Sequence, residues 1–128
     1  MHRFGFLLVL LLVLVLAGCG GDASPAASPG DAAEGEKVYA DVAAPACSTC
    51  HSLEPGVTMV GPSLSGVGAA AGSRVSGMSA VDYLAQSVRE PDAHVVEGFA
   101  PGIMSSAYGA QLTEQQLNDL VAYLQTLK

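Results

Sequence analysis

The chain has 128 residues, with 12 acidic and 5 basic side chains, and its formal charge is −7. One domain is the most that this length supports, because domains usually contain about 100–150 residues. The basic residues beyond position 18 are scattered, whereas phosphate-backbone recognition needs clustered Lys and Arg, so nucleic-acid binding is excluded.

The amino terminus has the three-part layout of a secretory signal. Arg3 supplies positive charge, an apolar run follows from Phe4 to Leu16, and small residues precede Cys19. The run is shorter than the about 20 residues that span a bilayer. A cysteine after Leu-Ala-Gly resembles the lipobox of bacterial lipoproteins, which implies cleavage before it and a lipid on its thiol. We therefore predict a signal peptide over residues 1–18, with an uncleaved helical anchor as the alternative.

Residues 19–30 are predicted to be the lipidated cysteine and a flexible tether. After Cys19 they read GGDASPAASPG, and small residues with two prolines cannot build a core. The body of the protein is expected over residues 31–128. With either interpretation of the leader, this body lies outside the cytoplasm and is attached to a membrane, through the lipid on Cys19 in the preferred one.

The body predicts an all-α fold, because three segments have helical patterns and none alternates as a strand does. The first segment spans Asp31 to about Ala43, and Asp31 is suited to cap it. The second runs from about Ala80 to Glu90, with Ser79 as its cap in a capping-box pattern. Pro91 ends this second helix.

The third helix has the clearest pattern, with Thr113 as its cap and Gln116 at the capping-box position. The stretches between the helices, Ser52–Met78 and Asp92–Leu112, are expected to be loops. Loops that long in a small domain wrap a ligand or fail to fold, so something large and apolar is expected at the centre. The inward positions at helical spacing are Val38, Tyr39 and Val42, then Val81, Leu84, Ala85 and Val88, and finally Leu117, Leu120, Val121, Leu124 and Leu127.

Cys47, Cys50 and His51 form the C-x-x-C-H pattern, the attachment site of c-type haem. Cysteines three apart on a helical turn project to one side, so their sulfurs can bond the two vinyl groups on one porphyrin edge. His51 is then carried under the ring, where its imidazole can ligate iron. Zinc would need four ligands, and a thioredoxin-like pair would need a parallel-sheet pattern; neither is found. The sequence therefore predicts one covalently bound haem c.

From about Asp31 to Lys128 the order of motifs resembles that of the class I cytochromes c. C-S-T-C-H is followed by Gly-Pro-Ser-Leu at 61–64, a methionine loop, and a closing helix ending LVAYLQTLK. The chain is particularly similar to the cytochrome c domains that accompany bacterial haem–copper oxidases. The resemblance implies the cytochrome c fold, with three main helices and long loops wrapped around one haem.

The resemblance also implies roles for individual residues outside the haem motif. Gly35 would let the first helix cross closely over the last, and Tyr39 would pack with Leu120 and Tyr123 at that crossing. The carbonyl of Pro62 would accept a hydrogen bond from the haem histidine.

The second axial ligand has four candidates with a suitable donor atom, namely Met59, Met78, His94 and Met104. Met59 is only eight residues past His51, which leaves little chain to reach the opposite face. Met78 is expected to pack at a helix entry, and His94 to be an exposed or hydrogen-bonded loop residue. The resemblance places the distal ligand at Met104, and a thioether favours ferrous iron and raises the potential.

With both axial positions filled by protein, iron has no open site for a substrate, so outer-sphere electron transfer is predicted rather than catalysis. The expected protein is a membrane-tethered, single-haem electron carrier and not an enzyme. The resemblance implies a quinol-oxidising complex as donor and a terminal oxidase or photosynthetic centre as acceptor. Two alternatives remain: a haem-based peroxidase or gas sensor with a labile distal ligand, and a structural lipoprotein with a metal clip instead of haem.

Docking to a redox partner cannot depend on a ring of lysines, because the chain has only Lys37 and Lys128. Two modes are left. The partner is contacted through an apolar rim, or acidic patches meet a basic partner.

Overall fold

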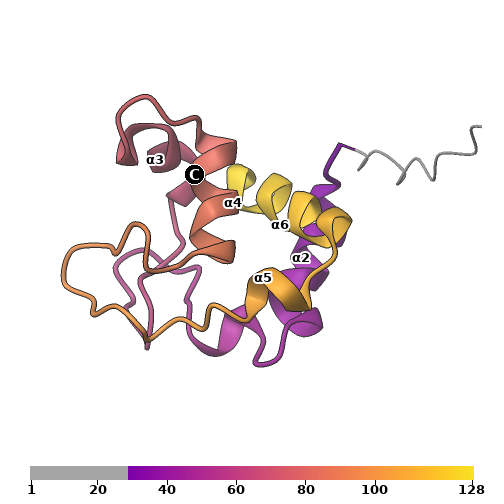
Figure 1. Ribbon diagram of the computed structural model, residues 1–128, viewed down its shortest axis with the longest axis horizontal. Coiled ribbons are helices and arrows are strands. Elements are labelled where there is room, and N and C mark those ends of the chain that lie inside the picture. The colour runs from indigo at the N-terminus through magenta and orange to yellow at the C-terminus, as the bar shows by residue number, and fades with distance from the viewer. Residues whose placement is uncertain (1–28) are drawn as a thin grey trace, which may run out of the picture.

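The computed structural model describes residues 29–128; the predicted leader and Cys19 lie outside this part. Its elements are helices joined by loops, with no strand in the described range, and the all-α prediction is confirmed. No helix among these residues is long and apolar enough to cross a membrane. The helices are α2 (Ala32–Lys37), the π-helical turn η1 (Val38–Val42), the 3-10 turn η2 (Cys47–Thr49), α3 (Val67–Arg74), α4 (Ala80–Arg89), α5 (Tyr108–Gln111) and α6 (Glu114–Thr126). Figure 1 shows α3, α4, α6 and α2 from the upper left to the right of the view, α5 below them, and long loops extending to the lower left.

The closest approach of two helices is the crossing of α2 and α6. A Cβ atom at Gly35 would lie 1.9 Å from the carbonyl oxygen of Asp119, so only glycine fits there. Beside this point the rings of Tyr39 and Tyr123 pack with centroids 5.8 Å apart, and Leu120 belongs to the same buried core. The crossing predicted from the resemblance is therefore present.

A buried carboxylate ties the start of α2 to α6. Asp119 Oδ1 accepts hydrogen bonds from the backbone N–H of Asp31 and from Gln115 Nε2, both at 2.8 Å. Asp31 in turn caps α2, because its own carboxylate accepts from the N–H of Ala33 at 2.8 Å. The chain is thus fixed to α6 at the residue where the predicted tether ends.

The predicted caps of the other two long helices are also observed. Ser79 Oγ accepts from the N–H of Asp82 at 3.1 Å at the start of α4. Thr113 and Gln116 form both hydrogen bonds of a capping box at the start of α6. Glu90 leaves the helical conformation directly before Pro91, as expected for a residue that precedes proline.

Two positions predicted to face inward are exposed. Val81 is 47% exposed, because Tyr83 and Leu84 take the inward side of α4. Val42 is 45% exposed because it lies in the π-helical turn, where the wider turn rotates later residues around the axis. The remaining predicted core positions are buried or partly buried.

The stretches expected to be loops contain two further helices, which corrects that prediction. The helix α3 is built from small residues and lacks the stripe of large side chains that marks a helix in a sequence. Its small residues let it approach α6: a Cβ at Gly68 would lie 2.4 Å from the Gln125 carbonyl oxygen, and Ala71 is fully buried. The single turn α5 is held by Tyr108, whose hydroxyl donates to the Pro45 carbonyl at 2.9 Å.

Candidate functional site

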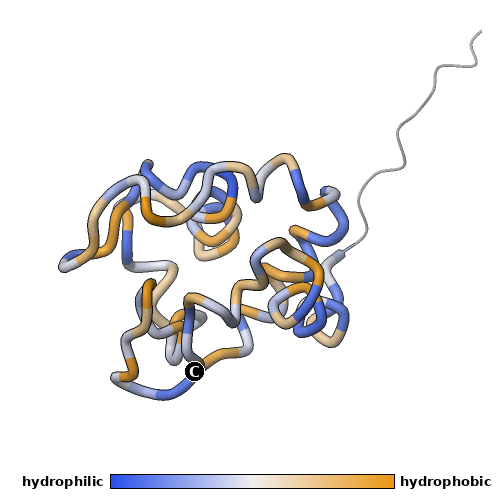
Figure 2. The backbone as a smooth tube through the Cα atoms, turned by 90° about the horizontal axis from the view of Figure 1, so that it is seen from below, coloured by the Kyte–Doolittle hydropathy of each residue, from blue (hydrophilic) through white to orange (hydrophobic). Residues whose placement is uncertain are grey.

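A large apolar cavity lies between the helices and the two long loops. It is open to solvent on one side and is lined mostly by apolar side chains from both the helices and the loops. The wall from the helices includes Leu84, Val88, Leu120 and Leu124. Figure 2 shows hydrophobic residues on several separate stretches of the backbone. The sequence predicts a large apolar group at the centre of the fold, and the structure has a cavity at that place.

The C-x-x-C-H segment forms one end of this cavity. The N–H groups of Cys50 and His51 both donate to the Cys47 carbonyl, at 3.1 and 3.0 Å, and this tight turn brings the three side chains to the same place. Both thiols are free and partly buried, and burial raises the pKa of the Cys47 thiol. All three residues line the cavity.

The imidazole of His51 is held in one orientation by its neighbours. Its Nδ1 lies 2.8 Å from the Pro62 carbonyl oxygen, which can only accept, so Nδ1 is the donor and Nε2 is left free to ligate. A Cβ at Gly61 would lie 2.5 Å from the ring, so the loop can pass it only as glycine. The hydroxyl of Tyr39 donates to the His51 carbonyl at 2.7 Å and fixes the backbone as well.

Of the four candidates for a second ligand, two line the cavity. Met104 is partly buried and comes from the loop before α5. His94 also lines the cavity, but its Nε2 lies 3.1 Å from Gln86 Oε1, so it is a hydrogen-bonded loop residue as expected. Met59 is 47% exposed and does not line the cavity, and Met78 packs against the core beside α4.

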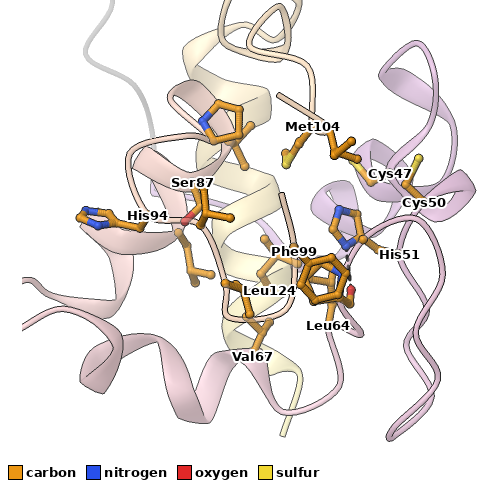
Figure 3. Close-up of a pocket in the computed structure, with 18 of the residues that line it drawn as sticks. Cys47, Cys50, His51, Leu64, Val67, Ser87, His94, Phe99, Met104 and Leu124 are labelled. Atoms are coloured by element: carbon orange, nitrogen blue, oxygen red, sulfur yellow. Dashed lines mark hydrogen bonds between the residues drawn. The ribbon is translucent and has the colours of Figure 1, made fainter. Parts of the chain in front are cut away.

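Figure 3 shows how these side chains lie relative to one another. Cys47, Cys50 and His51 come from one segment and Met104 from another, and they meet in one region of the cavity, whereas His94 lies apart from them. The structure therefore brings together the two thiols, the imidazole and one thioether.

The donor set fits an iron that a porphyrin already holds. No group of three or more His, Cys, Asp or Glu side chains within residues 29–128 could hold a metal ion unaided. One imidazole and one thioether would instead suit an iron that is already held by a porphyrin, and the apolar walls would suit the porphyrin itself. The lining thus fits a c-type haem better than a zinc ion.

Several residues that line the cavity were missed in the sequence, and Tyr83 and Phe99 are two of them. Tyr83 stands next to Leu84 on α4 and extends its inward stripe by one position, so the helical pattern could have revealed it. Phe99 lies in the loop of residues 91–107, where no periodicity marks inward positions.

The comparison with known families agrees with this geometry. The family model described as Cytochrome c matches residues 32–128, which is nearly all of the described part. No curated protein matches the chain.

Proposed function

Since the chain belongs to the cytochrome c family and carries its covalently bound haem with iron, we propose that it is a membrane-tethered electron carrier with His51 and Met104 as axial ligands. When bound, the haem supplies a one-electron redox couple at its iron. The observation that carries the proposal is an apolar cavity with the C-x-x-C-H segment at one end and Met104 entering from a separate loop.

Each residue of the motif has a separate task in this proposal. Cys47 and Cys50 anchor the porphyrin through thioether bonds, which prevents its loss. His51 would present Nε2 to the iron, because its Nδ1–H donates a hydrogen bond to the Pro62 carbonyl. Met104 would supply the iron with a soft thioether ligand, which favours the ferrous state.

The walls of the cavity contribute by excluding water. Leu84, Val88, Leu120 and Leu124 are buried and come from α4 and α6, which pack against each other. An apolar wall on rigid helices keeps the surroundings nearly the same in both oxidation states. Reorganisation on electron transfer is therefore small, as an electron carrier requires.

The rim of the cavity supports docking through apolar contact. Val60 and Ile103 both line the cavity and are both 58% exposed, so they flank its mouth. Neither lysine lines it. The proposed partners are a quinol-oxidising complex as donor and a terminal oxidase or photosynthetic centre as acceptor, with the chain as a free carrier or a subunit of such a complex.

The membrane attachment is proposed from the amino terminus. Cleavage of residues 1–18, a lipid on Cys19 and a tether to residue 30 would place the body, residues 31–128, at the outer side of a membrane. Mass spectrometry of the mature protein tests this attachment: we expect an amino-terminal peptide that begins at Cys19 and carries the added mass of a lipid. An amino-terminal peptide that still contains residues 1–18 would contradict the lipid anchor.

The ligand assignment is tested by Met104→Ala with Met78→Ala as the matched control. The weak ferric absorption band that reports a sulfur–iron bond should be present in the wild type, absent in Met104→Ala and retained in Met78→Ala. Met78 packs against the core without lining the cavity, so its loss affects stability alone. A band that survives in Met104→Ala would contradict the assignment.

The carrier is also distinguished from a haem enzyme by its response to external ligands. With two protein ligands on the iron, carbon monoxide and cyanide should bind slowly at neutral pH. Rapid binding to the wild type would instead indicate a labile distal ligand and a haem-based peroxidase or gas sensor.

A further inference from the structure

The loop that carries Met104 has little in its own sequence to hold it in one conformation. Gly98 and Gly102 have positive φ angles of 88° and 77°, and a Cβ atom at either position would meet nothing within 4 Å. Ser105 follows Met104, so no proline ring restricts the backbone at that point. The local chain therefore leaves the thioether free to move unless contacts with other segments hold the loop.

Before Met104, the loop is tied back to the end of α4 by Asp92. The Asp92 Oδ1 accepts a hydrogen bond from the Gly102 N–H at 2.7 Å, across ten residues of chain. Among the described residues, this bond is the one that joins residues 100–104 to the rest of the chain. Asp92 itself stands in a turn directly after α4, where the Ala93 N–H donates to the Glu90 carbonyl at 2.9 Å. A rigid helix thus anchors the loop.

On its other side, the loop runs into α5, which is bonded to the segment shortly before the C-x-x-C-H motif. Tyr108 is buried, and its hydroxyl donates to the Pro45 carbonyl at 2.9 Å. Gln111 uses both ends of its amide on Ala44: Oε1 accepts from the Ala44 N–H at 3.2 Å, and Nε2 donates to the Ala44 carbonyl at 3.3 Å. Three hydrogen bonds therefore join the chain after the loop to the segment that carries the two cysteines.

We propose that Asp92 and Tyr108 are positioning residues that hold the Met104 loop from its two ends, so that the thioether stays at the iron. The proposal rests on the proposed role of Met104 as an axial ligand. Gln111 reinforces Tyr108. Because α5 is bonded to the segment before the cysteines, the two parts of the chain that bind the haem move together.

The proposal predicts how fast an external ligand reaches the iron. Cyanide can bind only after the thioether has left, so its binding rate reports how often the loop opens. A hydrogen bond that only the closed loop makes lowers the population of the open form. Its loss should therefore speed cyanide binding by about threefold to tenfold, the factor that one intramolecular hydrogen bond contributes.

The contribution of α5 is tested by Tyr108→Phe, with Tyr123→Phe as the matched control. Both tyrosines are buried, but the Tyr123 hydroxyl makes no hydrogen bond within residues 29–128. Stopped-flow cyanide binding to the ferric, haem-loaded proteins is measured at neutral pH, and the weak sulfur–iron band is recorded. We expect faster binding and a weaker band in Tyr108→Phe, and wild-type behaviour in Tyr123→Phe. Gln111→Ala should act as Tyr108→Phe does, and Gln111 does not line the cavity, so a direct contact with the haem is not the cause.

The contribution of Asp92 is tested by two substitutions that differ in one property. Asp92→Ala removes the acceptor for the Gly102 N–H, whereas Asp92→Asn keeps an acceptor oxygen and removes only the charge. We expect faster cyanide binding in Asp92→Ala and a rate close to that of the wild type in Asp92→Asn. Glu97→Ala removes an exposed carboxylate that has no hydrogen bond in the described part of the same loop, and it should leave the rate unchanged. Equal acceleration in all three variants would indicate an effect of charge and would overturn the role of Asp92.

The outcomes separate the positioning role from the ligand assignment. If the wild type shows the sulfur–iron band, and Tyr108→Phe, Gln111→Ala and Asp92→Ala all bind cyanide at the wild-type rate, the positioning role is overturned and Met104 stands as the ligand. If the wild type lacks the band, both are overturned. Should an alanine variant fail to load haem, Tyr108→Phe still decides, because it removes a single oxygen atom.

Discussion

The α2–α6 side of the body and its cavity side are stabilised in different ways. At the crossing of α2 and α6 the backbones meet at Gly35, and tyrosine and leucine side chains fill the space beside it. On the cavity side, the loop of residues 51–66 and the loop of residues 91–107 enclose a space that the chain does not fill. The first side has its own core, whereas the second supplies only walls and depends on the haem for its interior.

Loss of the haem should produce the largest effect and should act mainly on the cavity side. The double variant Cys47→Ser/Cys50→Ser cannot form thioethers. We expect the loss of several kcal/mol of unfolding free energy, a large fraction of the stability of a small domain. Thermal unfolding by circular dichroism measures this loss.

Hydrogen exchange of the same variant sharpens the comparison of the two sides. Amides of the 91–107 loop should lose protection first, and those of α6 last. The control is Met59→Ala, which removes an exposed methionine outside the cavity and should leave the melting temperature nearly unchanged. If the amides of the 51–66 and 91–107 loops were as well protected without haem as with it, the cavity side would not depend on the haem for its interior.

Breaking the crossing should have the next largest effect. In Gly35→Ala the new methyl group would stand 1.9 Å from the Asp119 carbonyl oxygen, so the helices must separate, at a cost of about 3 kcal/mol or more. The control is Gly72→Ala, which lies within α3. Its new methyl group would have its nearest neighbouring heavy atom at 3.8 Å, an ordinary contact distance. That variant should be stabilised by about 0.5–1 kcal/mol through helix propensity. Urea unfolding of both variants measures the change in unfolding free energy, which should be a loss in Gly35→Ala and a gain in Gly72→Ala.

Alkaline pH should destabilise the protein through buried tyrosines at both sides. Burial raises the pKa of Tyr39, Tyr108 and Tyr123 above the ordinary value of about 10. The folded state therefore binds these protons more tightly than the unfolded state. The contribution of these tyrosines to the free energy of unfolding is complete below about pH 10. It is lost as the pH rises through their raised pKa values. Urea unfolding in a series of alkaline buffers measures the loss, and Tyr123→Phe should reduce its steepness.

The smallest expected effect is that of salt on electron transfer. With Val60 and Ile103 at the mouth and no lysine in the cavity lining, the rate with the physiological partner should depend only weakly on ionic strength. A rate that falls with salt would indicate acidic patches meeting a basic partner. Stopped-flow measurement over a range of salt concentrations decides between these, and a rate that rises steeply with salt would contradict both.

The parts of the fold that could be predicted are those with a strong local signal. The caps at Asp31, Ser79 and Thr113 depend on neighbouring residues alone, and each is observed. The C-x-x-C-H motif and the need for an apolar interior were also evident from the sequence. The predicted contact between His51 and Pro62 is present, although only a family resemblance pointed to it.

The parts that escaped prediction depend on packing between distant segments. The helix α3 has no apolar stripe, because its contact with α6 is made by glycine and alanine, as at Gly68. Val42 points outward because of a π-helical turn, which no local pattern announces. Arg74 is one of the scattered basic residues of the sequence, and only the fold places it at the cavity.

We propose that a porphyrin bound through Cys47 and Cys50 completes the interior of this protein. Mature protein is denatured and digested, and the peptide that contains both cysteines is examined by mass spectrometry. We expect a visibly coloured peptide with the added mass of one haem. An unmodified peptide, obtained from protein that was compact and unfolded cooperatively, would overturn the proposal.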